Sequence, residues 1–309
     1  MNFRQINYFL TVVEYMNITK AAKSLYVSQQ ALSEQIQKLE EEFGKPLFIR
    51  NPRLRLTDAG TFLYEKAREL AEIETQLING IHDLGEQYSG TLTIGIGRTL
   101  GLKILPIVLP DFSRHYPNVK IVVKQGGFLE LSHWLEEGEV DILISSKPRI
   151  YSNIEITPLF EESFGLIVPT NIMQALFPEN TEKWAEKFKH RLDISQFSDA
   201  PFLIYNERNH VYTRCLYDNG ISPKIVAEIN DTETLFQLAK QGMGVCFCSV
   251  PGRTIPEGLY CFPVDKNVLS ERIVIARRQE GYMTNSIRAF IAHTERCCKT
   301  FFEASASEG

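Results

Sequence analysis

Residues 18–43 constrain the fold of this chain more than any other stretch of its sequence. Two short helical patterns, at residues 19–25 and 29–43, are separated by the three-residue break Tyr26-Val27-Ser28. A break of this length between two short helices predicts a helix-turn-helix. Ser28 suits the start of the second helix, because its hydroxyl can accept a hydrogen bond from an orphan backbone N–H group.

The second of these helices has an apolar face and a polar face. Four apolar residues recur at helical spacing and are expected to form a buried stripe: Leu32, Ile36, Leu39 and Phe43. Another face carries four polar residues: Gln30, Ser33, Glu34 and Gln37. Such side chains can hydrogen-bond base edges in the major groove of DNA. The helix is therefore a candidate recognition helix, and Thr19, Ser28 and Gln29 are further candidate DNA contacts.

The flanking segments complete a winged helix-turn-helix. Residues 3–15 predict a first helix that Asn2 can cap, with an apolar stripe to pack behind the recognition helix: Ile6, Phe9, Leu10 and Val13. After Gly44, residues 47–49 and 54–56 predict two short strands, which form the wing. Three arginines of this wing are expected to contact phosphates or the minor groove: Arg50, Arg53 and Arg55. The alternative is a solvated basic hairpin.

Residues 58–87 form one helical pattern that is much longer than a usual globular helix. Thr57 can cap its start. Alternating steps of four and three, the spacing of a coiled-coil seam, connect seven residues: Leu63, Ala67, Leu70, Glu74, Leu77, Ile81 and Leu84. Glu74 is the misfit in this seam. We expect the other long side chains, Leu63, Leu70, Leu77, Ile81 and Leu84, to form a dimer. The alternative is a helix that packs only on its own domain.

After a break at residues 88–90, strands and helices alternate. Strands are expected at residues 91–96, 119–124 and 141–144, and helices at 101–115 and 129–137. This βαβαβ order predicts a parallel sheet covered by helices. A second α/β group follows, with expected strands at 164–168, 202–205, 224–228 and 245–248 and helices at 211–219 and 232–241. Residues 272–277 and 284–302 are expected to return to the first group, and the tail after Phe302 to be disordered.

These patterns predict three parts, namely a DNA-binding domain at residues 1–58, a linker helix at 59–88 and an α/β domain at 89–309. Within the α/β domain, subdomain I would span about 89–165 and 268–302, and subdomain II about 166–267. The formal charge is +2 for residues 1–60 and −7 for the rest, so only the N-terminal part is net basic. No signal peptide or membrane-length apolar run occurs, which predicts a cytoplasmic protein without a membrane partner.

The six cysteines contain no C-x-x-C pair: Cys215, Cys246, Cys248, Cys261, Cys297 and Cys298. In a reducing cytoplasm most of them should be free thiols. A redox sensor at Cys246 and Cys248 is one interpretation. Their strand-like setting instead favours buried residues that act as small hydrophobes.

The segment AAKSLYVSQQALSEQIQKLEEEFGKPLFIRNPRLRLTDAG resembles the N-terminal signature of the LysR-type bacterial transcriptional regulators, and the match runs from Phe3 to Gly60 without a gap. Gln30 stands where the family often has proline, and Glu34 where a basic residue is common. Glu34 can accept a hydrogen bond from cytosine N4, so it bears on the preferred DNA sequence. The resemblance implies a two-subdomain effector domain like that of periplasmic binding proteins, and a homotetramer.

Ligands of open α/β sheets bind beyond the carboxyl ends of the strands. Ten residues in such positions are candidate effector contacts: Arg98, Thr99, Leu100, Gly127, Phe128, Ser145, Tyr205, Asn206, Asp231 and Thr232. Arg98 and Thr99 precede a predicted helix, and a guanidinium beside a helix N-terminus favours a carboxylate or another small anion. The family resemblance implies that the segment 97–101 lines the effector pocket.

Motifs for other chemistry are absent from the sequence. The glycines at positions 95, 97 and 101 are spaced G-x-G-x-x-x-G, one residue too long for a dinucleotide fingerprint. The six histidines show no metal-ligand spacing, and no nucleophile motif occurs, so we expect no metal, no cofactor and no enzyme activity.

We therefore predict a LysR-type regulator that binds a dyad-symmetric double-stranded DNA operator, a small anionic effector for which a carboxylate is one candidate, and further copies of itself. RNA polymerase is considered as an additional partner. Two alternatives stay open, namely a solute sensor whose DNA-binding head no longer functions, and an enzyme that uses the α/β cleft.

Overall fold

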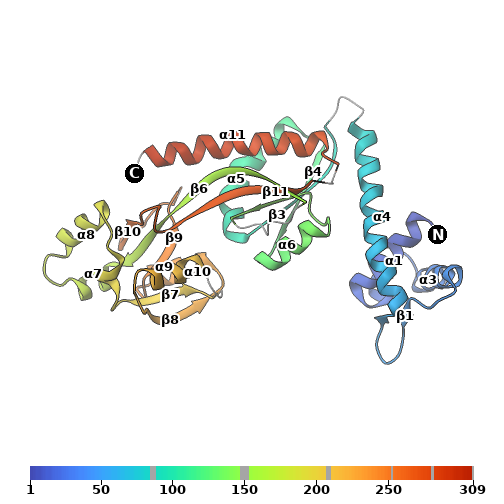
Figure 1. Cartoon of the computed structure of the whole chain (residues 1–309), viewed down its shortest axis with the longest axis horizontal. Coiled ribbons are helices and arrows are strands. Elements are labelled where there is room, and N and C mark those ends of the chain that lie inside the picture. The colour runs from blue at the N-terminus through green and yellow to red at the C-terminus, as the bar shows by residue number, and fades with distance from the viewer. Residues whose placement is uncertain (84–87, 147–152, 207–209, 252, 280–281, 308–309) are drawn as a thin grey trace. The chain divides into compact units, whose positions relative to one another are not determined.

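The computed structural model describes residues 1–83, 88–146, 153–206, 210–251, 253–279 and 282–307. The chain divides into two compact units (Figure 1), one of residues 1–90 with 281–285 and one of residues 91–280 with 286–309. The first unit is helical apart from a short hairpin, and the second is an α/β domain. Among the described helices, none combines the length and the apolar character needed to cross a membrane.

Three short helices form the core of the first unit: α1 (Phe3–Tyr15), α2 (Ile18–Ser24) and α3 (Gln29–Phe43). Each begins at a side chain that accepts a backbone N–H hydrogen bond, namely Asn2, Asn17 and Ser28. Strands β1 (Phe48–Ile49) and β2 (Arg55–Leu56) pair antiparallel, and helix α4 (Asp58–Asp83) follows. The winged helix-turn-helix predicted from the sequence is therefore confirmed.

Two apolar positions depart from the predicted stripes. Phe43 was expected to be buried but is 42% exposed, because α3 ends there and Gly44 turns the chain with a φ of 64°. In α1, Val12 is fully buried and Leu10 only partly so, because α1 contacts α2, α3 and α4 and its buried arc is wider than one stripe. Leu32, Ile36 and Leu39 are buried as predicted.

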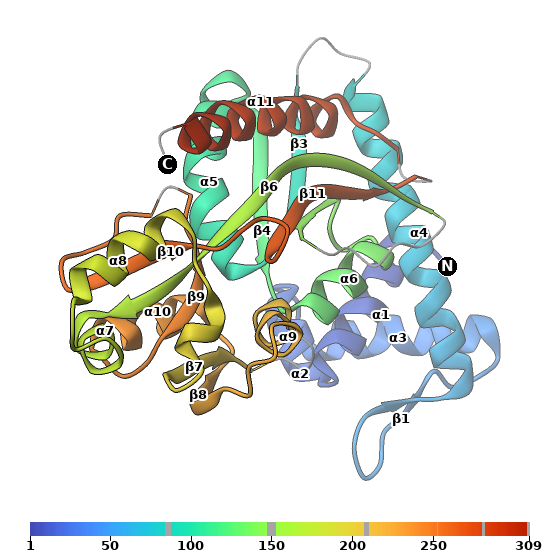
Figure 2. The same ribbon diagram turned by 60° about the vertical axis from the view of Figure 1, so that its left-hand side comes forward.

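A seven-stranded sheet runs through the second unit in the order β10-β6-β11-β5-β3-β4, and β9 also pairs with β6. Its strands are β3 (Gly90–Ile96), β4 (Val119–Gln125), β5 (Ile142–Ser145), β6 (Ile154–Pro169), β9 (Cys246–Ser249), β10 (Leu259–Pro263) and β11 (Ser270–Arg278). Helices α5 (Arg98–His115) and α11 (Asn285–Ser307) lie on one face of this sheet, and α6 (Phe128–Glu136) lies on the other (Figures 1 and 2). The T-shaped contact of Phe112 with Phe290 joins α5 to α11.

The sheet is mixed, which corrects the prediction of a parallel sheet. Strands β3 and β5 are parallel, as the βαβ pattern requires, but β11 is antiparallel to both β5 and β6. The late strand β11 returns from the second α/β group and enters beside β5 from the opposite end. Strand β6 is also longer than predicted, because residues 154–163 pair with β11 and residues 164–169 pair with β9 and β10.

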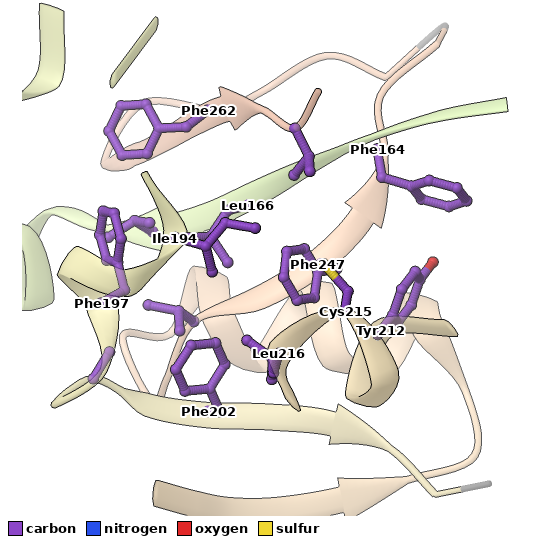
Figure 3. Packing of buried hydrophobic residues seen from close by; sticks show 14 of the residues in the cluster. Phe164, Leu166, Ile194, Phe197, Phe202, Tyr212, Cys215, Leu216, Phe247 and Phe262 are labelled. Carbon is purple, nitrogen blue, oxygen red and sulfur yellow. The ribbon is translucent and has the colours of Figure 1, made fainter. Parts of the chain in front are cut away.

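The second α/β group contains the parallel strands β7 (Pro201–Tyr205) and β8 (Lys224–Ile229) with helices α9 (Val211–Asp218) and α10 (Thr232–Lys240). Figure 3 shows its aromatic core, in which Phe197, Phe202 and Phe262 are fully buried. Helices α7 (Thr170–Leu176) and α8 (Thr181–His190) and the 3-10 helix at Ile194–Phe197 also contribute to this core. The sequence analysis did not anticipate these three elements.

The C-terminal helix corrects a further expectation. Residues 303–307 were expected to be disordered but continue α11 to Ser307. Alanine and glutamate, which are common in this tail, have high intrinsic helix propensity, so the helix can extend beyond its packed part.

Candidate functional sites

The polar face of α3 lies open to solvent. Gln30, Glu34 and Gln37 are exposed, whereas Ser33 is half-buried. At the start of this helix, Ser28 Oγ accepts a hydrogen bond from the Ala31 N–H at 3.1 Å. Thr19 Oγ1 donates to Gln29 Oε1 at 2.9 Å, which links α2 to the first turn of α3. The predicted recognition helix thus has a fixed N-terminus and a polar surface free to meet a partner.

Glu34 has a charge partner on its own helix. Its Oε1 lies 3.0 Å from Lys38 Nζ, one turn further on, and both side chains are more than half exposed. An exposed pair of this kind adds little stability, so either group can leave it for another partner. The pair places a cation beside this carboxylate of the polar face.

Glu40 organises the base of the wing. Its Oε1 accepts hydrogen bonds from the backbone N–H groups of Leu47 at 2.8 Å and Phe48 at 3.2 Å. Its Oε2 forms an ion pair with Arg50 Nη2 at 3.0 Å. Arg53 and Arg55 are exposed. The three wing arginines therefore differ, because Arg50 is held by a carboxylate of the same domain. The sequence analysis missed Glu40, since it lies on the recognition helix and seven to ten residues from its partners.

Tyr26 is the other residue of this surface that the sequence analysis did not single out. It lies in the turn between α2 and α3, its φ is 55°, and its side chain is 97% exposed. A left-handed backbone at a residue other than glycine is unfavourable, and an exposed ring contributes no packing that would offset it. Its place in the three-residue break is the signal that could have drawn attention to it.

The predicted dimer seam of α4 divides into two parts. Leu63, Ala67 and Leu70 pack against the core of the winged helix-turn-helix, as the alternative interpretation expected. Further along, Leu77 is 57% and Ile81 67% exposed. Leu84 lies outside the described residues. Among the described residues of the predicted seam, Leu77 and Ile81 in the second half of the helix are thus the ones that offer exposed apolar side chains to a second chain.

A cavity of about 690 Å³ opens between the first and second α/β groups of the second unit. Eight of the ten predicted effector residues line it: Arg98, Thr99, Leu100, Gly127, Phe128, Ser145, Tyr205 and Asp231. Asn206 and Thr232 do not line it. The sequence analysis missed Glu130, His210 and Glu271, which do. Glu271 begins β11, so only the return of that strand brings it to the cavity.

Two helix N-termini meet across this cavity. Thr99 on α5 and Thr232 on α10 share a hydrogen bond between their hydroxyls at 2.7 Å, and Arg98 and Asp231 precede them in the chain. Hydrogen bonds from Thr234 lower the pKa of the Asp231 carboxyl, and the charge of Arg98 lowers it further. Asp231 is therefore ionised at neutral pH, and it faces a guanidinium from the opposite side of the cleft.

Burial makes the thiols of β9 poor nucleophiles. Cys246 and Cys248 are buried on the side of the sheet that α10 covers, as the interpretation as small hydrophobes expected. Burial raises the pKa of the Cys246 thiol well above its ordinary value and that of Cys248 to about 12. All six cysteines are free. Among the described residues, no three His, Cys, Asp or Glu side chains are placed to hold a metal ion.

Comparison with known families identifies two domains in the chain. The family described as bacterial regulatory helix-turn-helix protein, lysR family, matches residues 3–61, and the LysR substrate binding domain matches residues 85–298. The chain therefore belongs to the LysR family of transcriptional regulators, with a helix-turn-helix DNA-binding domain and a substrate-binding domain.

Individual relatives cover nearly the whole chain. The uncharacterized HTH-type transcriptional regulator YwbI of Bacillus subtilis (strain 168) is 29% identical over 306 residues and covers 96% of each chain. The crystal structure of full-length CbnR with its target DNA has a TM-score of 0.66 at 21% identity and covers 96% of this chain and 100% of that chain. A full-length OxyR variant from Pseudomonas aeruginosa has a TM-score of 0.71 at 23% identity and covers 97% of this chain and 95% of that chain. These two structures share the fold of this chain.

Proposed function

We propose that this protein reads a dyad-symmetric operator with helix α3 and changes its regulation of transcription when a small anionic effector binds in the cavity. The exposed polar face of a firmly capped α3 carries the DNA part of this proposal. Side chains of this kind hydrogen-bond base edges when a recognition helix enters the major groove. The CbnR structure with its target DNA supports the same mode of binding.

The proposed DNA contacts fall into two groups. Base contacts would come from Gln30, Ser33, Glu34 and Gln37. Phosphate or groove contacts would come from Thr19, Ser28, Gln29, Arg50, Arg53 and Arg55. Because Arg50 is already paired with Glu40, we expect Arg53 and Arg55 to contribute more to affinity and to its salt dependence.

The first experiment recovers genomic fragments that bind the purified protein and maps the bound sites by footprinting. Enrichment of a few promoter-proximal sites with dyad symmetry would support the proposal. Replacing Gln30 and Ser33 by alanine should then abolish the preference for these sites, whereas Gln241→Ala, at an exposed position of the second unit, should leave it unchanged. Equal binding by the parent protein and the double variant would instead indicate a sensor whose helix-turn-helix no longer reads DNA.

Glu34 tests how the sequence is read. If its carboxylate accepts a hydrogen bond from cytosine N4, Glu34→Ala should relax discrimination at one base pair by about 1–3 kcal/mol. If the carboxylate only repels phosphate, the same variant should bind all sequences more tightly, and by a similar factor. Binding titrations on an operator series with each base changed in turn distinguish the two results.

The effector part of the proposal rests on α5. Its N-terminus borders the cavity together with Arg98, and a helix N-terminus beside a guanidinium attracts a small anion. The effector contacts that we propose are the ten residues predicted from the sequence, of which eight line the cavity. Replacing Arg98 by glutamine should weaken the response of the protein to its effector without changing its affinity for DNA in the absence of that effector.

Assembly and location complete the proposal. We propose that α4 joins two chains into a dimer and that, as in the related family, dimers pair into tetramers that approach RNA polymerase. The proposed domain limits remain 1–58, 59–88 and 89–309, with the α/β domain divided near residues 165 and 268. Because its proposed target is bacterial DNA, the protein would act in the cytoplasm and not as an enzyme.

A further inference from the structure

Four helices begin at the walls of the cavity, and at three of these starts a side chain of the protein accepts a backbone N–H hydrogen bond. Glu130 accepts a hydrogen bond from the backbone N–H of Gly127 at the start of α6. His210 and Asp231 do the same for α9 and α10. Within the part of the chain that the structure describes, α5 has no such side-chain cap. Of these four helices, α5 combines the absence of a side-chain cap with the absence of an acidic residue in its first turn, whereas α6 carries Glu130 there. The start of α5 is therefore the best placed of the four to hold an anion.

The charges around the cavity favour the same conclusion. Arg98 is the only lysine or arginine among the described residues that line it, whereas Glu130, Asp231 and Glu271 bring three carboxylates. Among the described lining residues, a second negative charge on a ligand would meet these carboxylates and no second lysine or arginine. Placing like charges together in a partly desolvated site is unfavourable. The described lining therefore favours a ligand with one negative charge over a dicarboxylate or a multiply charged phosphate.

The arrangement of Arg98 and Asp231 indicates which group the ligand carries beside its anion. The hydroxyl contact of Thr99 with Thr232 holds the two helix starts together, so a cation and an anion lie on facing sides of one small region. A ligand whose own carboxylate and ammonium are separated by one carbon matches this pair with charges reversed. We propose that the effector is an α-amino acid, with its carboxylate at the α5 N-terminus and Arg98 and its ammonium at Asp231.

This inference rests on the proposed effector function of the cavity, and binding to purified full-length protein tests it. The probes are the standard L-α-amino acids at millimolar concentration, the N-acetyl and amide derivatives of each, and the dicarboxylates succinate and glutarate. Calorimetry measures binding, and thermal unfolding measures the accompanying stabilisation. We expect at least one amino acid to bind and its two derivatives, which lack either the ammonium or the carboxylate, to bind at least about tenfold more weakly.

Two variants test which charged residue of the protein binds which charged group of the amino acid. Asp231→Asn keeps an N-cap for α10, because asparagine caps as well as aspartate, but removes the negative charge. In Asp231→Asn, the amino acid should bind more weakly, with an affinity close to that of its N-acetyl derivative. In Arg98→Gln, the affinity of the amino acid should fall close to that of its amide derivative. Asp193→Asn is the matched control, since Asp193 caps the 3-10 helix and does not line the cavity.

Each outcome decides the question. An amino acid that binds the parent protein and loses its advantage over the N-acetyl derivative in Asp231→Asn supports the inference. Binding of succinate or glutarate but of no amino acid overturns it and leaves the anionic effector of the proposed function in place. Failure of both classes overturns the inference but not the anionic effector in general, which includes anions outside these two classes, and the DNA footprints still test the helix-turn-helix separately.

Discussion

At Tyr26 the backbone adopts a conformation that its side chain does not favour, with a φ of 55° and an exposed ring. Glycine has no Cβ and adopts this region freely. Tyr26→Gly should therefore raise the free energy of unfolding by up to about 1 kcal/mol. The substitution removes the usual energetic penalty of a left-handed residue, but glycine also makes the unfolded chain more flexible, which offsets part of this gain. Urea denaturation measures the change.

The matched control is Tyr26→Ala, which removes the ring but keeps a Cβ in the left-handed turn. It should leave stability close to that of the parent protein. Equal stability of the glycine and alanine variants would contradict the argument from strain. Loss of DNA affinity in both variants at unchanged or increased stability would show that the exposed ring serves DNA binding instead of folding.

The α4 helix combines an internal packing role with an unpaired apolar surface. Leu63 and Leu70 belong to the core of the first unit, and Leu77 and Ile81 remain exposed. Replacing both Leu77 and Ile81 by aspartate should therefore separate the proposed dimer without unfolding the domain. We expect the dimer dissociation constant to rise by about a hundredfold or more, since buried apolar anchors carry most of an interface's energy. Analytical ultracentrifugation measures it.

Val268→Asp is the control for this prediction, because Val268 is 44% exposed and lies in the second unit. It should leave the oligomeric state unchanged. A double α4 variant that still sediments as the parent protein would place the dimer contact elsewhere. Loss of helical structure in that variant would instead indicate that the second half of α4 packs within its own chain.

The contact between α11 and α5 carries a pH dependence. His293 on α11 is 3% exposed, and it lies against Phe112 and 3.7 Å from Asp111 on α5. Burial lowers the pKa of the His293 imidazole below its ordinary 6.5, and the charge of Arg296 lowers it further. The unfolded chain therefore binds a proton first as the pH falls. This contribution to stability is complete above about pH 6.5 and is lost as the pH falls toward the folded pKa.

The test compares urea unfolding of the parent protein and His293→Gln over a pH series. Between about pH 6.5 and the folded pKa, the parent should lose up to about 1.4 kcal/mol per pH unit more than the variant. The variant will be less stable at neutral pH, so the comparison uses only the slope of the free energy of unfolding against pH. Identical slopes would mean that the imidazole does not titrate differently in the two states.

At the scale of the whole molecule, regulation requires that the effector favour one arrangement of the α/β domain over another. The cavity lies where the first and second α/β groups meet, and the Thr99–Thr232 contact bridges them. An effector that binds there should change the spacing or bend of the bound operator. Footprints with and without effector should therefore differ at the outer half-sites, by a change in protection or in hypersensitive positions.

Thr99→Val tests the bridge, since valine keeps the shape of threonine and removes the hydroxyl. We expect this variant to give an intermediate footprint in the absence of effector, because the ligand-free arrangement loses a contact that joins the two groups. A footprint identical to that of the parent protein under both conditions would show that this contact does not bias the arrangement.

The sequence by itself determined the helices of the first unit and most strands and helices of the second. These elements depend on local spacing and on caps such as Ser28, and their signals lie within one or two turns of the chain. The strand-to-helix turns at Arg98 and Asp231 were also identified in this way, because a ligand position beyond a strand end follows from chain order alone. For the same reason eight of the ten candidate effector residues line the cavity.

Tertiary structure decided what depends on partners far apart in the chain. Glu40 binds the wing, β11 enters beside β5 with reversed direction, and Glu271 reaches the cavity only through that strand. No local pattern predicts such a pairing, because it is selected by burial of apolar faces across the whole domain. The α4 seam combines the two cases. Its spacing was evident in the sequence, whereas the tertiary structure decided that its first half packs on the core of its own unit.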